Sequence, residues 1–208
     1  MASAVPRLIA FSDTTRVASA LMLDRFSALA ERARAGEVLF IVRDYALPIR
    51  ERWLLAQRLA ELSVRTRQRF GIAERADLAR ALGADAFHLP QGGLSAADAR
   101  GYLGPNVLLS RGAHAPGAFV DGEVEAELDA VLLSPIFEVR KGRPALGVAA
   151  LERARAAHPE QAWFGLGAVA ADNAAACLSA GAAGVAVIGA ALEPNPGPLL
   201  AALGILGH

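Results

Sequence analysis

The sequence predicts a single (β/α)₈ barrel, a TIM barrel of the α/β class that spans residues 1–208, and three observations support this. Short apolar runs alternate along the chain with amphipathic helical patterns, which is the rhythm of β–α units. The apolar runs are continuous, which is typical of parallel strands covered on both faces. About eight such units fit into the chain, as a closed barrel requires. An open doubly wound sheet is the alternative.

The predicted strands are short apolar runs that end in polar residues or in glycine. They cover residues 7–13, 37–44, 69–74, 86–90, 106–112, 130–138, 162–169 and 184–192. In a barrel of this kind the binding and catalytic groups lie at the C-terminal ends of the strands. The residues that end these runs are therefore the candidates for a functional site.

The predicted helices follow the strands and show apolar residues at helical spacing. They cover residues 17–35, 49–66, 75–82, 95–103, 148–157, 171–181 and 199–206, with at most a short helix at 122–128. The pattern over 49–66 places Leu54 on the apolar side and Arg52 on the polar side. Ser95 has the position and chemistry of an N-cap, with Asp98 three residues later.

Composition and charge exclude several classes of protein. The 21 basic residues balance the 21 acidic ones, so the chain has no overall field for nucleic acid or for an anionic membrane. No apolar run of about 18 residues predicts a membrane span. The single cysteine, Cys177, and the absence of a signal-peptide pattern fit a cytoplasmic protein. We expect a small molecule as partner, and a homo-oligomer stays open.

Small residues end the last two predicted strands, and this pattern predicts a phosphate site. Barrels often bind phosphate with the loops after these strands, where backbone N–H groups approach the anion. The candidate residues are Gly167, Ala168, Ile188 and Gly189. The alternative is close packing of small residues around the start of a helix.

A basic loop follows the sixth predicted strand. Arg140, Lys141 and Arg143 surround Gly142, and Lys141 is the only lysine of the chain. Cations at this position could close over a phosphate or diphosphate at the barrel mouth. A solvated surface loop is the equal alternative.

Three segments together resemble the thiamin phosphate synthase/TenI family of (β/α)₈ barrels. They read ERADLARALGADAFHLPQGGLS from residue 74, AVLLSPIFEVRKGRPALG from residue 130 and GLGAVAADNAAACLSAGAAGVAVIGAAL from residue 165. The resemblance implies a role in thiamin biosynthesis and a phosphorylated thiazole, or a similar heterocycle, as substrate. In the synthases of this family, a pyrimidine diphosphate loses pyrophosphate with the help of Mg²⁺. The thiazole nitrogen takes the place of the leaving group.

The resemblance also assigns roles to residues of this chain. It makes Arg43 catalytic, and it makes Gln91 and Ser134 substrate-binding. From the basic loop we expect Lys141 to be catalytic and Arg140 and Arg143 to bind substrate. Two positions of the diphosphate half depart from the family pattern: Ile41 replaces a glutamine and Tyr45 replaces a lysine.

The metal pattern is incomplete. Glu74 keeps one metal carboxylate, and Gly92 and Gly93 stand where the second is expected. Because Mg²⁺ needs one or two carboxylates besides substrate phosphate, Glu74 alone would hold it weakly. We therefore expect a transferase related to thiamin phosphate synthase with a weakened diphosphate and magnesium site.

Two other functions stay open. The first is a metal-free thiazole tautomerase or similar isomerase, because Leu89, Pro90 and Gln91 resemble the turn of the tautomerases. The tautomerase histidine is replaced by Pro135, so His114 is the candidate acid or base. His88 is interpreted as a histidine satisfied within the core. The second alternative is a paralogue that binds a phosphorylated ligand without turnover.

Overall fold

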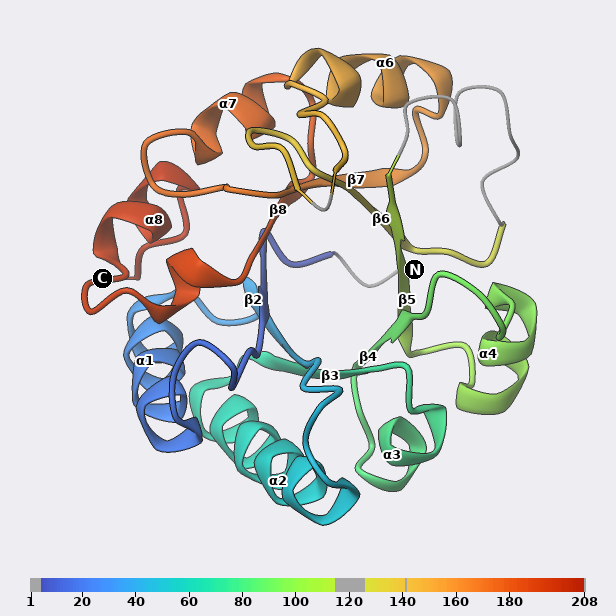
Figure 1. Cartoon of the computed structure of the whole chain (residues 1–208), viewed down its shortest axis with the longest axis vertical. Coiled ribbons are helices and arrows are strands. Elements are labelled where there is room, and N and C mark those ends of the chain that lie inside the picture. Colours follow the sequence, from blue (N-terminus) through green and yellow to red (C-terminus); the bar gives the residue numbers. More distant parts are fainter. Residues whose placement is uncertain (1–4, 115–125, 141, 208) are drawn as a thin grey trace.

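The structure, a computed structural model, describes residues 5–114, 126–140 and 142–207. Eight parallel strands close into a barrel in sequence order, and β1 pairs with both β2 and β8. Figure 1 shows this ring from one end, with the helices arranged around its outside. The predicted TIM barrel is therefore confirmed, and the open doubly wound alternative is wrong.

The strands are shorter than the apolar runs that predicted them. Their bounds are β1 Leu8–Phe11, β2 Val38–Val42, β3 Arg69–Ala73, β4 Ala86–Leu89, β5 Leu108–Ala113, β6 Ala130–Leu133, β7 Ala162–Leu166 and β8 Gly184–Val187. Each strand stops where the chain must turn outward toward a helix. The polar and small residues at the ends of the runs are consequently free to line the barrel mouth.

The helices connect the strands on the outside of the barrel. Their bounds are α1 Ser19–Arg32, α2 Ile49–Thr66, α3 Ala76–Ala81, α4 Ala96–Leu103, α6 Ala149–Ala157, α7 Ala174–Ser179 and α8 Gly197–Ala202, with a 3₁₀ helix, η1, at Gly189–Leu192. Ser95 caps α4 as predicted, since its Oγ accepts a hydrogen bond from Asp98 N at 3.0 Å. The predicted helix at 122–128 lies largely outside the described residues.

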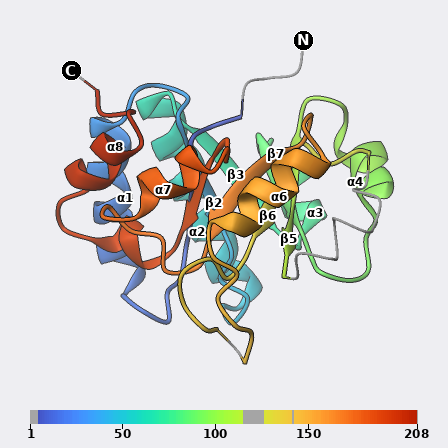
Figure 2. The same cartoon turned by 90° about the horizontal axis from the view of Figure 1, so that it is seen from above.

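Alternation along each strand divides the core into two parts. In β1, Ile9 and Phe11 belong to a cluster inside the barrel, while Leu8 and Ala10 pack toward the helices. The inner cluster fills the lumen, so the barrel is a packed core and not a pore. The loop between β6 and α6 extends beyond the C-terminal ends of the strands (Figure 2).

Two local predictions are wrong. The last strand does not run to residue 192, because β8 ends at Val187 and the small residues from Gly189 coil into η1. On α2 the sides of two residues are exchanged: Leu54 is 47% exposed, whereas Arg52 is 6% exposed. Arg52 is buried because its guanidinium reaches the end of β3 and donates a hydrogen bond to Ala73 O. Among the described residues, no helix is long and apolar enough to cross a membrane.

Candidate active site

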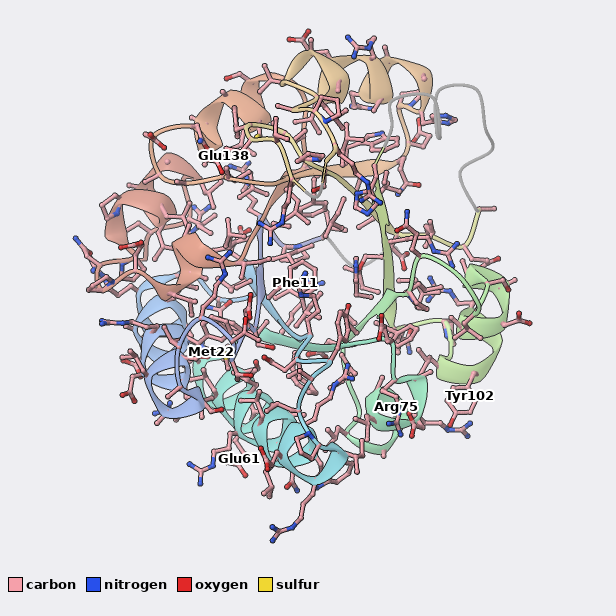
Figure 3. All side chains as sticks on the ribbon, viewed as in Figure 1. Phe11, Met22, Glu61, Arg75, Tyr102 and Glu138 are labelled. Carbon is pink, nitrogen blue, oxygen red and sulfur yellow. The ribbon has the colours of Figure 1, made fainter. Side chains whose placement is uncertain are left out.

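A cavity with two connected lobes opens at the C-terminal ends of the strands. The central lobe, of about 580 Å³, lies over the barrel mouth and receives residues from every strand end. The β7–β8 lobe, of about 610 Å³, lies over the loops that follow the last two strands. Arg140, Leu166, Gly167 and Ile188 line both lobes, so the two form one elongated space. Figure 3 shows Phe11 near the barrel axis and Glu138 farther out, on the side of α7.

The structure brings together all but one of the residues predicted for the site. The central lobe is lined by Arg43, Glu74, Gln91, His114, Ser134, Arg140, Arg143, Gly167 and Ile188. The β7–β8 lobe adds Ala168 and Gly189. Lys141 lies outside the described residues. Proximity of these side chains is thus observed, while the role of each remains a prediction.

Backbone amides dominate the β7–β8 lobe. Asn173 folds the loop after β7, since its Oδ1 accepts from Ala170 N at 2.9 Å and its Nδ2 donates to Ala168 O at 3.0 Å. Within the described chain, the N–H groups of Gly167, Ala168 and Gly189 find no protein acceptor. Unpaired amides around a cavity provide donors for an anion.

Gly167 cannot be replaced without disturbing this loop. Its φ of +106° is a left-handed conformation that L side chains rarely adopt. A Cβ at this position would lie 2.8 Å from Pro135 Cα and 3.1 Å from Ile136 N. Gly189 differs, because a Cβ there would meet only Arg16 Nη1, at an ordinary 3.5 Å.

Two arginines bring positive charge to the β7–β8 lobe. Arg16 reaches it from the loop after β1, and its Nε is 3.2 Å from Asp13 Oδ2. Arg140 reaches it from the short hairpin of the basic loop, in which Arg140 N donates to Arg143 O at 3.0 Å. The acidic residues Glu138, Asp172 and Glu193 line the same lobe. The two guanidinium groups are the cations that could pair with an anion held by the amides.

A buried carboxylate joins the ends of β1 and β2. Asp44 is 6% exposed and accepts hydrogen bonds from Ser12 Oγ, Thr14 N and Thr14 Oγ1, the last at 2.7 Å. Ser12 Oγ in turn accepts from Arg43 N at 2.9 Å. The loop after β1 and the backbone of Arg43 are therefore fixed to one anchor.

Arg43 lies between two aromatic rings in the central lobe. Its guanidinium carbon is 5.6 Å from the centroid of Phe11 and 5.9 Å from that of Tyr45. Arg52 lies 5.5 Å from the Tyr45 ring, so cations and rings alternate. We call Phe11, Arg43, Tyr45 and Arg52 the guanidinium–aromatic ladder. Among the described residues, the carboxylate oxygen nearest to Arg43 is Asp13 Oδ2, at 3.9 Å.

Among the described residues, the carboxylates of the central lobe form no complete metal site. Burial would raise the pKa of Asp13, but hydrogen bonds from Thr15 and Arg16 and the charge of Arg43 lower it overall. Asp44 is occupied by its hydroxyl and amide donors. Over the described ranges, no group of three His, Cys, Asp or Glu side chains is placed to hold a metal ion without help from a ligand. The residues present therefore do not fit a resident Mg²⁺, because Glu74 is left to supply the protein's carboxylate alone.

Two histidines face the central lobe in different surroundings. His88 Nδ1 is 3.0 Å from Ser110 Oγ, and its ring meets Phe11 edge-on at 5.1 Å. Burial, assisted by the charge of Arg43, lowers the pKa of His88 to about 3, so the imidazole is neutral at pH 7. His114 Nδ1 donates to Ser134 O at 3.2 Å. His88 is hydrogen-bonded as the core interpretation expected, although it also lines the cavity.

Sequence reasoning missed three polar residues of the site. Asp44 follows Arg43 directly, Arg16 follows the run Asp13-Thr14-Thr15, and Arg52 lies a full helical turn into α2. The available signal for Arg16 was the cluster of hydroxyl and carboxyl groups after the first strand. Asp44, after the second strand, is the acceptor that these hydroxyl groups need. Arg52 carried none, because its spacing placed it on the polar side of the helix.

The chain matches one family model over most of its length. The model describes thiamine monophosphate synthase and matches residues 14–191. The chain is 31% identical over 166 residues to a thiamine-phosphate synthase of Thermobifida fusca. The aligned region covers 78% of this chain and 76% of the relative. It is 32% identical over 170 residues to a thiamine-phosphate synthase of Thermus thermophilus, which covers 80% and 81%.

Solved structures agree with this match at the level of the fold. The thiamine phosphate pyrophosphorylase of Pyrococcus furiosus superposes with a TM-score of 0.78 at 19% identity, covering 95% of each chain. A 4-hydroxy-2-oxoglutarate aldolase superposes with a TM-score of 0.61 at 18% identity, covering 96% of this chain and 92% of the other. The barrel alone is therefore compatible with different chemistries.

Proposed function

The chain belongs to the thiamine monophosphate synthase family, and we propose that its cavity binds and converts a phosphorylated thiazole or similar heterocycle. Membership of the family supports a function in thiamin biosynthesis and a transferase activity. The finer assignment is made from the site. The phosphate would lie in the β7–β8 lobe, and the heterocycle would extend into the central lobe.

One observation carries this proposal: unpaired amides converge in the β7–β8 lobe. The N–H groups of Gly167, Ala168 and Gly189 have no acceptor within the described chain, and Arg16 and Arg140 line the same lobe. A phosphate monoester would satisfy the amides and pair with the guanidinium groups. Ile188 positions the loop from β8, where it lines both lobes.

The central lobe supplies the groups for the transfer. The C–O bond between the pyrimidine methylene and the diphosphate breaks, pyrophosphate leaves with the electron pair, and the thiazole nitrogen forms the new C–N bond. Arg43, Arg140 and Arg143 would stabilise the charge that develops on the leaving group. Gln91 and Ser134 would contact the heterocycle from the ends of β4 and β6. Lys141 is also proposed to be catalytic, from its place in the basic loop, and it lies outside the described residues.

A second candidate activity is a metal-free tautomerisation of the phosphorylated thiazole. The observation that favours it is the place of His114, which lines the central lobe and is oriented by its hydrogen bond to Ser134 O. A proton removed from one ring position and returned to another requires an acid or base of this kind. Turnover that persists in a chelator would favour this activity over the transferase.

The test compares two substitutions of Gly189, the glycine of the lobe that has room for a side chain. Gly189→Asp places a negative charge beside Arg16, and Gly189→Asn is the matched neutral control of equal size. We expect Gly189→Asp to weaken thiazole phosphate binding about 100-fold, while Gly189→Asn weakens it only severalfold. Isothermal titration calorimetry measures both constants.

Two results would contradict the proposal. Equal affinity of the two variants would place the phosphate elsewhere, and no binding of thiazole phosphate by the unaltered chain would remove its basis. Tight binding without product formation from thiazole phosphate and pyrimidine diphosphate, in Mg²⁺ or in chelator, would leave the non-catalytic paralogue as the function.

A further inference from the structure

A buried guanidinium lies behind the end of β3. Arg52 is 6% exposed, donates to Ala73 O and lies 5.5 Å from the Tyr45 ring. Its Nε is buried and has no hydrogen-bond partner in the part of the chain that the structure describes. The positive charge of Arg52 is therefore held by the hydrogen bond to Ala73 O and by the Tyr45 ring, while its Nε–H stays unpaired. Burying this charge costs desolvation free energy that an exposed arginine does not lose.

The carboxylates of the central lobe offset this cost. Glu74 directly follows Ala73, the acceptor of Arg52, and lines the central lobe. Burial lowers the pKa of Arg52, and the negative charges of Glu74 and Asp44 act in the opposite direction. Arg52 therefore lies within electrostatic reach of Glu74 and of Asp44. Any divalent cation approaching Glu74 would meet a fixed positive charge behind it.

Arg52 is also the inner end of the guanidinium–aromatic ladder. Its guanidinium carbon lies 5.5 Å from the Tyr45 ring, and that of Arg43 lies 5.9 Å from the Tyr45 ring and 5.6 Å from the Phe11 ring. A guanidinium held near aromatic rings keeps its N–H groups available for hydrogen bonds. Arg43 consequently brings a positive charge to the central lobe, with Asp13 Oδ2 at 3.9 Å.

We propose that Arg52 is a built-in counter-cation to Glu74, so that the central lobe binds the anionic group of its ligand without a divalent metal. Arg52 acts as a positioning residue, since it holds Tyr45 and through it Arg43, and it takes over the charge balance that Mg²⁺ would otherwise provide. The inference rests on the proposed function, which places a ligand in this cavity. It adds that the ligand's second anionic group is bound by guanidinium groups alone.

The first test measures metal binding directly by electron paramagnetic resonance of Mn²⁺. We expect the unaltered chain to leave the free Mn²⁺ signal unchanged, and Glu74→Gln to make no difference. Arg52→Gln removes the counter-cation, so it should bind Mn²⁺ and reduce the free Mn²⁺ signal. The Mn²⁺ affinity of this variant should exceed the upper limit set for the unaltered chain by about tenfold or more. Arg58→Gln, an exposed position on the same helix, is the matched control and should behave like the unaltered chain. Stoichiometric Mn²⁺ binding by the unaltered chain, lost in Glu74→Gln, would overturn the proposal.

The second test uses inorganic pyrophosphate as the anion and does not depend on whether Arg52→Gln folds. It is done in the Gly189→Asp background, which disfavours anions in the β7–β8 lobe. We expect pyrophosphate to bind in excess EDTA, and Glu74→Gln to strengthen binding by roughly threefold, because a negative charge leaves the lobe. Glu61→Gln makes the same change on the outer face of α2 (Figure 3) and should have no effect.

Pyrophosphate binding that requires Mg²⁺, or that weakens in Glu74→Gln, would overturn the proposal. Either result would mean that Glu74 holds a metal ion and that this ion attracts the anion. These results are separable from a failure of the proposed function. That function fails if thiazole phosphate does not bind, whereas the present inference is decided by Mn²⁺ and pyrophosphate.

Discussion

The two lobes of the cavity recognise anions by different means. The β7–β8 lobe relies on backbone amides that a glycine-containing loop exposes, supported by Arg16 and Arg140. The central lobe relies on side chains, namely the guanidinium–aromatic ladder, the buried carboxylate of Asp44 and Glu74. A site made of amides needs only that the backbone keep its path. A site made of side chains changes with each substitution. Of the positions that depart from the family pattern, Tyr45 lines the central lobe and Ile41 belongs to the core inside the barrel.

The strongest test of this comparison alters the backbone of the β7–β8 lobe. Gly167→Ala forces an alanine into φ +106° and brings its Cβ within 2.8 Å of Pro135 Cα. We expect a loss of about 3–4 kcal/mol in the free energy of unfolding, from left-handed strain together with overpacking. Urea denaturation measures the loss. Gly92→Ala, where a Cβ meets nothing within 4 Å, is the control and should change stability little. Full stability of Gly167→Ala would mean that the amide loop does not depend on its glycine.

A second test removes the anchor of the central lobe. Asp44→Ala leaves Ser12 Oγ, Thr14 N and Thr14 Oγ1 without their acceptor. We expect about 2–3 kcal/mol of destabilisation, because three donors at a buried site lose a charged partner. Asp24→Ala, at an exposed position of α1, serves as the control. A loss no greater than that of Asp24→Ala would show that side-chain anchoring contributes little to this lobe.

The sequence predicts the barrel and the surroundings of the cavity better than the contacts within it. Apolar runs and helical spacing are local properties, so the order of the β–α units and the approximate positions of the strands could be read directly. Arg52 could not be placed in this way, because helical spacing describes the helix alone and does not include the carbonyl of Ala73 that buries the guanidinium. The end of β8 was missed for a similar reason: the run from Gly184 to Leu192 is apolar throughout, yet only packing decides where strand gives way to 3₁₀ helix.

The last prediction concerns His88, which connects the side-chain lobe to pH. Burial lowers the pKa of His88 to about 3 from an ordinary value of 6.5, so the folded state binds its proton less readily than the unfolded state. The neutral form therefore contributes stability at pH above 6.5, and this contribution is lost as pH falls from about 6.5 toward 3. The loss should not exceed about 1.4 kcal/mol per pH unit, the value for one proton.

Stability curves of the unaltered chain and of His88→Asn, measured by urea denaturation between pH 7 and pH 4, isolate this contribution from that of the carboxylates. We expect the unaltered chain to lose stability more steeply than His88→Asn below about pH 6.5, because only the unaltered chain must take up a proton at this position on unfolding. Parallel curves for the unaltered chain and His88→Asn would mean that His88 titrates alike in both states. The central lobe would then be better hydrated than its rings and guanidinium groups imply. The difference in hydration between this lobe and the amide-lined β7–β8 lobe would be smaller than the comparison assumes.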